Sequence, residues 1–386
     1  MLLALGVGSA SAAAAGGKGT VCPTGQMRVA TGCATYSAVE ARMTKMVRAQ
    51  MGELGLRSTI IRLDSGTTTV LNAGFGNSMK GVPASPRMYW RIGSIAIPYL
   101  INLLLQLQDE GKLSLNDKLA KYEPDVPEAS QVTLRMLASS ASGYPDWVQH
   151  NEAFQKVLFE NPFHQWTGAE LIREAFKQPL PCAPETCFHY AHTNFALLSE
   201  VISKVTRQPV GKLIDERVLG PLGLDHTQIS RYPAFPGAAL HAYTGERGLY
   251  EDATFWSPSW SIGEGTVMTA TMGDVVRGAR LIDRGALISR RANRERTEAV
   301  TAGLGPFDQS FYYALGILAA NGWQFQNPFI DGYTGVAAYL PTQDLTLGIV
   351  TTQLPQSSAN GVNNATEMLR KLSAYLSPEH VLELRK

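Results

Sequence analysis

A predominantly apolar segment that follows a serine constrains the fold more than any other part of this sequence. Residues 99–107 are apolar except for one asparagine and one glutamine, and residues 108–117 (QDEGKLSLND) are mostly polar. This pattern predicts a buried helix from about Ser94 to Glu110. Serine is strongly preferred at a helix N-cap, which is the simplest role for Ser94.

Strand-like segments lie near both ends of the chain, and the sequence between them is mainly helical up to about residue 287. Strands are expected at residues 59–63, 68–76, 311–319, 335–340 and 345–352. Other helices are expected at residues 37–51, 195–204, 210–218 and 363–376. We therefore predict an α+β fold, in which the N- and C-terminal strands form one antiparallel sheet with flanking helices, beside an inserted, mainly helical region.

The composition suits a globular chain of one large or two modest domains. Of the 386 residues, 45% are apolar and 17% are charged, and the net charge is +1. This balance gives no basis for binding nucleic acid or an anionic membrane, and no apolar stretch approaches the length of a membrane span. We predict a single domain over residues 21–386, with a sheet lobe (about 37–90 and 300–386) and a helical lobe (about 91–299).

The first 20 residues resemble a targeting segment. Residues 1–7 form a short apolar core, and residues 9–15 are the small residues of a cleavage site, although no basic stretch precedes them. The alternative is an alanine-rich N-terminus without a targeting role. A signal-like segment at residues 1–20 predicts a secreted or periplasmic protein.

Four cysteines fall in two close pairs, Cys22 with Cys33 and Cys182 with Cys187. An even number in an exported protein suggests disulfides, and four cysteines allow three connectivities. We expect pairing within each close pair, because both flank turn-rich sequence. A zinc site is the weaker alternative, since the spacings fit no standard finger. We predict no metal or other cofactor.

Several segments resemble the serine β-lactamase and penicillin-binding protein superfamily, which includes D-Ala-D-Ala carboxypeptidases and class C β-lactamase-like esterases. Residues 90–117 resemble its nucleophile segment. Residues 132–146 are similar to its T-L-R-x-L-L-S-H-T-S-G-L-P-D segment, with Ser140 in place of the histidine. The resemblance covers roughly residues 37–376 and implies a β-lactamase/transpeptidase-like fold.

The family's S-x-x-K motif lacks its lysine in this chain. The motif reads Ser94-Ile95-Ala96-Ile97. Residues three apart share a helical face, so the family's lysine amine reaches the serine hydroxyl. A serine hydroxyl is a weak nucleophile until a base or cation activates it, and isoleucine is neither. The resemblance implies nucleophilic chemistry at Ser94, and the substitution predicts that this chemistry is lost or strongly weakened.

The second family motif, Y-x-N, reads Tyr190-Ala191-His192. In the family this tyrosine lies near the serine and transfers its proton, which implies the same role for Tyr190. Histidine is well suited to general base catalysis near neutral pH, so His192 is a second candidate base. The alternatives are a buried tyrosine with a satisfied hydroxyl and a histidine that only forms hydrogen bonds.

The third family motif, K-T-G or H-x-G, aligns with residues 326–328 (QNP), where the basic residue is absent. Pro328 cannot donate to a β-ladder and predicts an edge or irregular strand. The backbone N–H groups of Phe329 and Ser94 would form the family's oxyanion pair. Residues 256–265 resemble a family segment that includes Trp260 and forms part of the cleft wall. The candidate substrate-binding residues are Gln326, Asn327, Phe329 and Trp260.

Two functions of different classes remain open. The first is a pseudoenzyme that keeps the fold and cleft, and it is favoured because Ile97, His192 and Gln326 all depart from the motifs. The second is an active serine hydrolase of the esterase, β-lactamase or D-Ala-D-Ala carboxypeptidase type. In that case Ser94 is the nucleophile and Tyr190 or His192 the base. Either way, the expected ligand is a small molecule or a peptidoglycan-like peptide.

Overall fold

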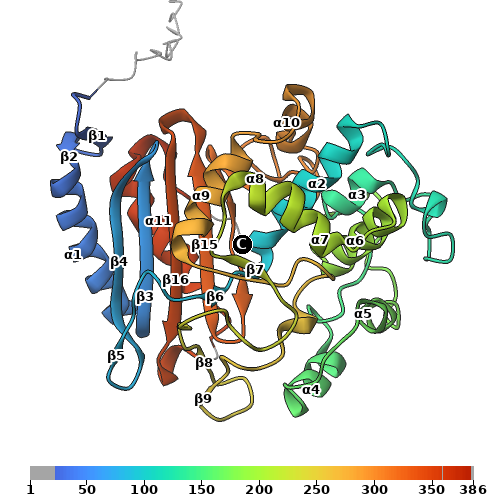
Figure 1. Cartoon of the computed structure of the whole chain (residues 1–386), viewed down its shortest axis with the longest axis horizontal. Helices are drawn as coiled ribbons and strands as arrows, with labels where there is room; N and C mark the ends of the chain where they lie inside the picture. The colour runs from blue at the N-terminus through green and yellow to red at the C-terminus, as the bar shows by residue number, and fades with distance from the viewer. Residues whose placement is uncertain (1–21, 359, 384–386) are drawn as a thin grey trace, which may run out of the picture.

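The computed structural model describes residues 22–358 and 360–383, and the signal-like segment at residues 1–20 lies outside this part of the chain. A large sheet forms one side of the molecule and a mainly helical region forms the other (Figure 1). Within the described residues, no helix is both long and apolar enough to cross a membrane.

The large sheet has nine strands in the order β11-β12-β13-β15-β16-β3-β4-β5, with β14 also paired to β15. Its strands are β3 (Leu56–Ser65), β4 (Thr68–Met79), β5 (Val82–Pro83), β11 (Phe311–Tyr313), β12 (Leu318–Ala320), β13 (Trp323–Gln326), β14 (Phe329–Ile330), β15 (Tyr333–Leu340) and β16 (Leu345–Gln353). All of its pairs are antiparallel, and β3 lies against β16. The predicted α+β fold, with one sheet built from both ends of the chain, is therefore confirmed.

Helices cover both faces of this sheet. On one face, α9 (Met272–Asp283) packs where Met272 and Val276 approach Gly348 of β16 so closely that a Cβ atom there would lie within 2.6 Å of either side chain. On the other face, the Thr334 side chain of β15 accepts a hydrogen bond from the Ala365 amide of α11 (Asn364–Leu376). Successive residues of a strand point to opposite faces, which places α9 and α11 on opposite sides.

The helices surround a buried core. They are α1 (Tyr36–Leu54), α2 (Ile97–Asp109), α3 (Leu134–Ala138), α4 (Glu152–Glu160), α5 (Gly168–Ala175), α6 (His192–Thr206), α7 (Val210–Ile214), α8 (Gly220–Leu222), α9 (Met272–Asp283), α10 (Arg290–Thr297) and α11 (Asn364–Leu376). In α2, the predicted buried helix, every residue from Tyr99 to Leu107 is buried. A short 3₁₀ turn, Gly93–Ala96, precedes it.

Two predictions of local structure were wrong in part. The region from about residue 223 to 267 has no α-helix, only the 3₁₀ turn Pro258–Trp260, and carries the short strands β7 (Thr227–Ile229), β8 (Tyr243–Thr244) and β9 (Glu251–Asp252). Its glycines and prolines favour turns over helix. Residues 311–319 form two strands, because Gly316 takes a φ of +66° in the turn between β11 and β12. Small strands β1 (Gln26–Val29), β2 (Gly32–Thr35), β6 (Trp90–Arg91) and β10 (Met268–Ala270) complete the fold.

Both predicted disulfides are present, Cys22–Cys33 and Cys182–Cys187. The second bridge closes a loop that packs on the segment around Gly143. A Cβ atom on Gly143, whose φ is +74°, would lie 2.2 Å from the Cys182 carbonyl oxygen. Glycine at position 143 is therefore what permits this contact.

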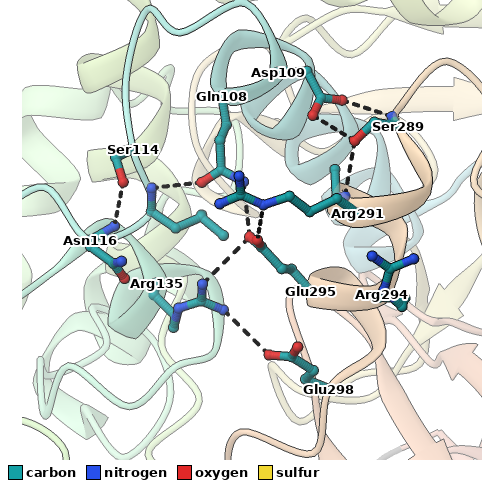
Figure 2. A network of polar contacts seen from close by, with 12 residues as sticks. Gln108, Asp109, Ser114, Asn116, Arg135, Ser289, Arg291, Arg294, Glu295 and Glu298 are labelled. Carbon is teal, nitrogen blue, oxygen red and sulfur yellow. Dashed lines mark hydrogen bonds and ion pairs between the residues drawn. The ribbon is translucent and has the colours of Figure 1, made fainter.

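A polar network anchors the C-terminal end of α2 to α10 (Figure 2). The Gln108 side chain donates to Glu295 at 2.9 Å and accepts from the Leu115 amide at 2.9 Å. Asp109 accepts from both the amide and the hydroxyl of Ser289 at 2.7 Å. Charged hydrogen bonds of this kind are stronger than neutral ones. The network holds the far end of the helix that follows the turn carrying Ser94.

Candidate active site

Ser94 lies in a tight turn that depends on glycine at position 93. Gly93 adopts a φ of +48°, and a Cβ atom built on it would lie 2.6 Å from the Cβ of Pro328. Any side chain there would clash, and the left-handed backbone would add strain. This close approach places Ser94 beside the junction of β13 and β14. The turn has no side-chain cap, so Ser94 is not an N-cap and its hydroxyl is available for other contacts.

The structure brings the Tyr190 side chain close to that of Ser94, and both residues line the same cavity. Tyr190 is the second residue before α6, and its ring meets the rings of His192 and Tyr313 edge-on, at centroid distances of 5.2 and 6.1 Å. Burial raises the pKa of Tyr190 well above 10, and Ser94 opposes this only in part. Near neutral pH the tyrosine is therefore protonated and cannot take up the serine proton as a phenolate.

Ile97 occupies the position of the family's lysine, and it belongs to the apolar core. Its side chain is fully buried. It packs beside Ile101 against Gly316, where an added Cβ atom would lie 2.8 Å from the Ile97 Cγ2 atom and 2.5 Å from the Ile101 Cγ1 atom. No lysine or arginine is found among the described residues that line the cavity at Ser94. The charge that would lower the pKa of Tyr190 is thus missing from the lining.

His192 is held by a buried carboxylate. Its Nδ1 atom lies 2.8 Å from Oδ2 of Asp146, and its backbone N–H donates to the same oxygen at 2.5 Å. The other oxygen of Asp146 accepts from the amides of Val148 and Gln149, both at 2.7 Å. Burial acts to raise the pKa of Asp146, but His192 and the Gln149 amide outweigh it, and the net shift is downward.

The ionisation of Asp146 decides the tautomer of His192. A carboxylate can only accept hydrogen bonds, so Nδ1 of His192 carries the proton that it shares with Asp146. The Nε2 atom of neutral His192 then has a free lone pair. His192 lines the cavity that contains Ser94, and its ring lies 5.7 Å from that of Trp147. The pair therefore has the form of a base with its positioning carboxylate.

The Phe329 amide is oriented away from β15. Gly335 donates to the carbonyl of Pro328 at 2.9 Å, which makes Pro328 and Gly335 a hydrogen-bonded pair of the ladder. Hydrogen-bonded and non-hydrogen-bonded pairs alternate in antiparallel strands, so Phe329 and its partner Thr334 form a non-hydrogen-bonded pair. The N–H group of Phe329 therefore points away from β15, as an oxyanion donor must.

Asn363 stabilises residues 327–328, where the strand is interrupted between β13 and β14. This irregular strand was predicted from Pro328. Its side-chain amide donates to the carbonyls of Asn327 at 2.9 Å and Pro328 at 2.8 Å. Its Oδ1 atom also accepts from the Thr366 amide and so caps α11. The Asn363 side chain thus fixes the irregular segment at residues 327–328 to the start of α11.

The four candidate substrate-binding residues, Gln326, Asn327, Phe329 and Trp260, all line the cavity, but they are not equally free. The Gln326 side chain is buried and donates to the Gly316 carbonyl at 2.7 Å and to the Tyr313 hydroxyl at 3.2 Å. Its donor group is therefore used within the protein. The Trp260 carbonyl accepts from the Trp147 indole at 2.8 Å, while Phe329 is 36% exposed.

A cavity of about 730 Å³ joins these groups. It lies between the sheet edge at residues 326–331 and the helical region around α4. Its volume is within the range of small-molecule sites in proteins. The lining includes Ser94, Tyr190, His192, Gln155, Leu158, Phe159, Phe188, Glu246, Trp260, Tyr313, Asn327, Phe329 and Asp331.

Comparison with known proteins identifies the family. A family model described as Beta-lactamase matches residues 43–369. The chain belongs to the beta-lactamase family. Protein flp of Staphylococcus aureus (strain N315) is 29% identical over 168 residues, which are 42% of this chain and 32% of that protein. The chain thus spans less than half the length of the first curated relatives that it matches.

Solved structures share the fold of this beta-lactamase family member. A D-stereospecific amidohydrolase from Streptomyces sp. has a TM-score of 0.71 at 23% identity, covering 84% of this chain and 99% of that one. The D-amino acid amidase from Ochrobactrum anthropi SV3, complexed with D-phenylalanine, has a TM-score of 0.74 at 18% identity, covering 86% and 97%. Identities this low support the fold alone.

Sequence reasoning missed two carboxylates of this site. Asp146 stands in the S-G-Y-P-D segment, which was used only for its resemblance, and a short Pro-Asp sequence gives no sign of a histidine partner. Asp331 lies in an Asp-Gly turn, which normally signals only a hairpin. In the described parts of the chain, no group of three or more His, Cys, Asp or Glu side chains could hold a metal ion.

Proposed function

We propose that this protein is a serine hydrolase homologue whose cavity binds a small acyl or peptide-like ligand, and whose acyl transfer is lost or strongly weakened. The buried Ile97 carries this proposal. Ser94 and Tyr190 line the same cavity, yet the pKa of Tyr190 is raised and the described lining holds no lysine or arginine to lower it. Removing one member of such a unit commonly costs several orders of magnitude in rate.

A serine-directed covalent probe tests the proposal. A fluorophosphonate and a labelled penicillin should label the protein slowly or not at all, and the Ser94→Ala variant should give the background level. Turnover of an activated ester or a β-lactam at about 1 per second or faster, lost in Ser94→Ala, would show the proposal wrong.

The Asp146–His192 pair favours a residual ester hydrolysis as the second candidate function. In this route the Ser94 oxygen attacks the ester carbonyl while its proton passes to Nε2 of His192. The same proton then goes to the leaving alcohol as the acyl-enzyme forms. Water repeats the transfer and releases the acid. The backbone N–H groups of Ser94 and Phe329 would stabilise the oxyanion, a contribution of about a hundred-fold or more for each donor.

We also infer a secreted or periplasmic location. The two disulfides support it, since such bonds persist mainly in oxidising compartments. Retention of both bridges in protein isolated without reductant from an extracellular fraction would test the inference. Free thiols at all four cysteines would contradict it.

A further inference from the structure

The loop closed by the second disulfide, residues 182–187, leads directly into the candidate site. Residues 188–191, which include Tyr190, have no regular secondary structure, and α6 begins only at His192. The N-cap of α6 is Ala191, which makes no side-chain hydrogen bond to the helix. The chain that carries the two candidate bases is therefore not held by a cap of its own, and contacts from outside the helix must fix it.

The loop is attached to the segment at residues 140–143. The Glu185 amide donates to the Ala141 carbonyl at 2.8 Å. Just after the loop, the His189 amide donates to the Ser140 carbonyl at 3.0 Å. These two bonds join irregular segments and belong to no sheet. They connect the chain before His192 with the chain that continues to Asp146.

The attachment is held in place by the disulfide and not by apolar packing. None of residues 181–187 is buried, so no side chain of the loop anchors it in the core. Glu185 and Ser140 also adopt left-handed backbone angles, with φ of +65° and +54°. Such angles are uncommon for residues other than glycine and persist where the surrounding structure imposes them. The bond between Cys182 and Cys187 is the covalent constraint on this loop.

The first disulfide offers a contrast within the same chain. It joins Cys22 to Cys33 across the hairpin of β1 and β2, where four residue pairs already form a ladder. No residue from 22 to 35 is among the described residues that line the cavity. Loss of this bridge would therefore remove a disulfide without touching the site.

The geometry that depends on residues 188–192 is tight. Nδ1 of His192 lies 2.8 Å from Oδ2 of Asp146, and the rings of Tyr190 and His192 meet edge-on at 5.2 Å. Hydrogen bonds lose most of their strength beyond about 3.5 Å, so a displacement of about 1 Å would separate the histidine from its carboxylate. Such a shift is small for an irregular segment that has lost its restraint.

We propose that the bridge between Cys182 and Cys187 is a positioning element of the candidate site. It keeps His192 against Asp146 and holds Tyr190 at the cavity. Neither cysteine is among the described residues of the lining, so the bridge acts through the chain that follows it. The proposal rests on the cavity being the site of the proposed function, and it adds what sets the geometry of that site.

Heteronuclear NMR of the His192 ring nitrogens tests this role, because it reports the tautomer and not the stability of the fold. The signals of His192 are those absent from His192→Asn. In the unmodified protein the neutral ring should carry its proton on Nδ1, which the Asp146 contact selects. In the variant with Cys182→Ser and Cys187→Ser both tautomers should occur. Amide hydrogen exchange at residues 185–192 should also become about tenfold faster, because the loop is no longer closed.

The matched control is the variant with Cys22→Ser and Cys33→Ser, which loses the other bridge. It should leave the tautomer of His192 and the exchange at residues 185–192 unchanged. If the variant without the second bridge does not fold, a phosphine can reduce the remaining bridge of the control variant in its folded state. The reduced protein should show the same change in tautomer.

The tautomer decides the outcome. An unchanged tautomer in folded protein that lacks the second bridge would overturn the proposal, whatever the exchange rates. An equal change in the control variant, or a proton on Nε2 in the unmodified protein, would overturn it as well. Fast ester turnover by the unmodified protein would instead refute the weakened acyl transfer and leave the NMR comparison valid, so the two failures can be told apart.

Discussion

Replacing Ile97 by lysine should restore part of the missing chemistry at the expense of stability. Ile97 is fully buried and packs against Gly316 and Ile101. Burial of an isoleucine side chain contributes about 1.5–3 kcal/mol. An ammonium in the same space adds a desolvation cost of several kcal/mol unless it finds partners. The new charge would act on the Tyr190 side chain, which lies close to Ser94.

We therefore expect Ile97→Lys to lower the free energy of unfolding by about 3–5 kcal/mol, measured by urea denaturation. Ile97→Met is the control for packing without charge, and it should cost less than about 1.5 kcal/mol. The lysine should also lower the pKa of Tyr190 and so raise the rate at which a labelled penicillin acylates Ser94. Gel fluorescence of the labelled protein measures that rate.

Two outcomes would refute this reasoning. If Ile97→Met is labelled as fast as Ile97→Lys, the gain comes from packing and the missing charge is irrelevant. If Ile97→Lys is folded but labelled no faster than the unmodified protein, the cation is not what limits Ser94. The double variant with Ser94→Ala must lose all labelling in either case, which confirms the site of attachment.

Three further predictions concern the histidine, the buried acid and a disulfide. Residual ester hydrolysis should fall in His192→Asn, because this variant removes the proposed base; an unchanged rate there, with Ser94→Ala inactive, would remove His192 from the mechanism. Folded Asp331 keeps its proton up to about pH 8 instead of 3.8, so the stability of the unmodified protein relative to Asp331→Asn should fall as pH rises between these values and then level off. If the unfolding temperatures of the unmodified protein and Asp331→Asn differ by the same amount at every pH in this range, the raised pKa of Asp331 is contradicted. Loss of the Cys182–Cys187 bridge, whose cysteines are 5 residues apart, should lower the free energy of unfolding by about 2 kcal/mol. An unchanged unfolding temperature in the variant with both cysteines replaced by serine would contradict this prediction.

The local features of the fold could be predicted because each depends on residues close together in the chain. The apolar run 99–107 required a buried helix, and α2 buries every residue of it. Short segments rich in apolar and β-branched residues located β3, β15 and β16, and β15 and β16 are buried at every position. Local predictions failed where a short signal was ambiguous, as at Gly316, whose φ of +66° divides one predicted strand into two. A glycine in a strand pattern can mark a turn, a bulge or nothing at all.

The motifs of the candidate site could likewise be located from the sequence, including the loss of the lysine at Ile97. Their geometry depended on contacts between distant segments. Asp146 and His192 meet only because the loop after α3 packs on the start of α6. The direction of the Phe329 amide follows from the register of β14 against β15.

Burial decided the electrostatics in the same way. The sequence by itself determined which ionisable groups this protein has, and it showed that one cation of the family is missing. Tertiary structure alone decided that Tyr190 and Asp331 are buried and raised in pKa, while Asp146 is buried and lowered. The reason is that a pKa depends on the desolvation and the partners of a group, and both are set by packing across the whole chain.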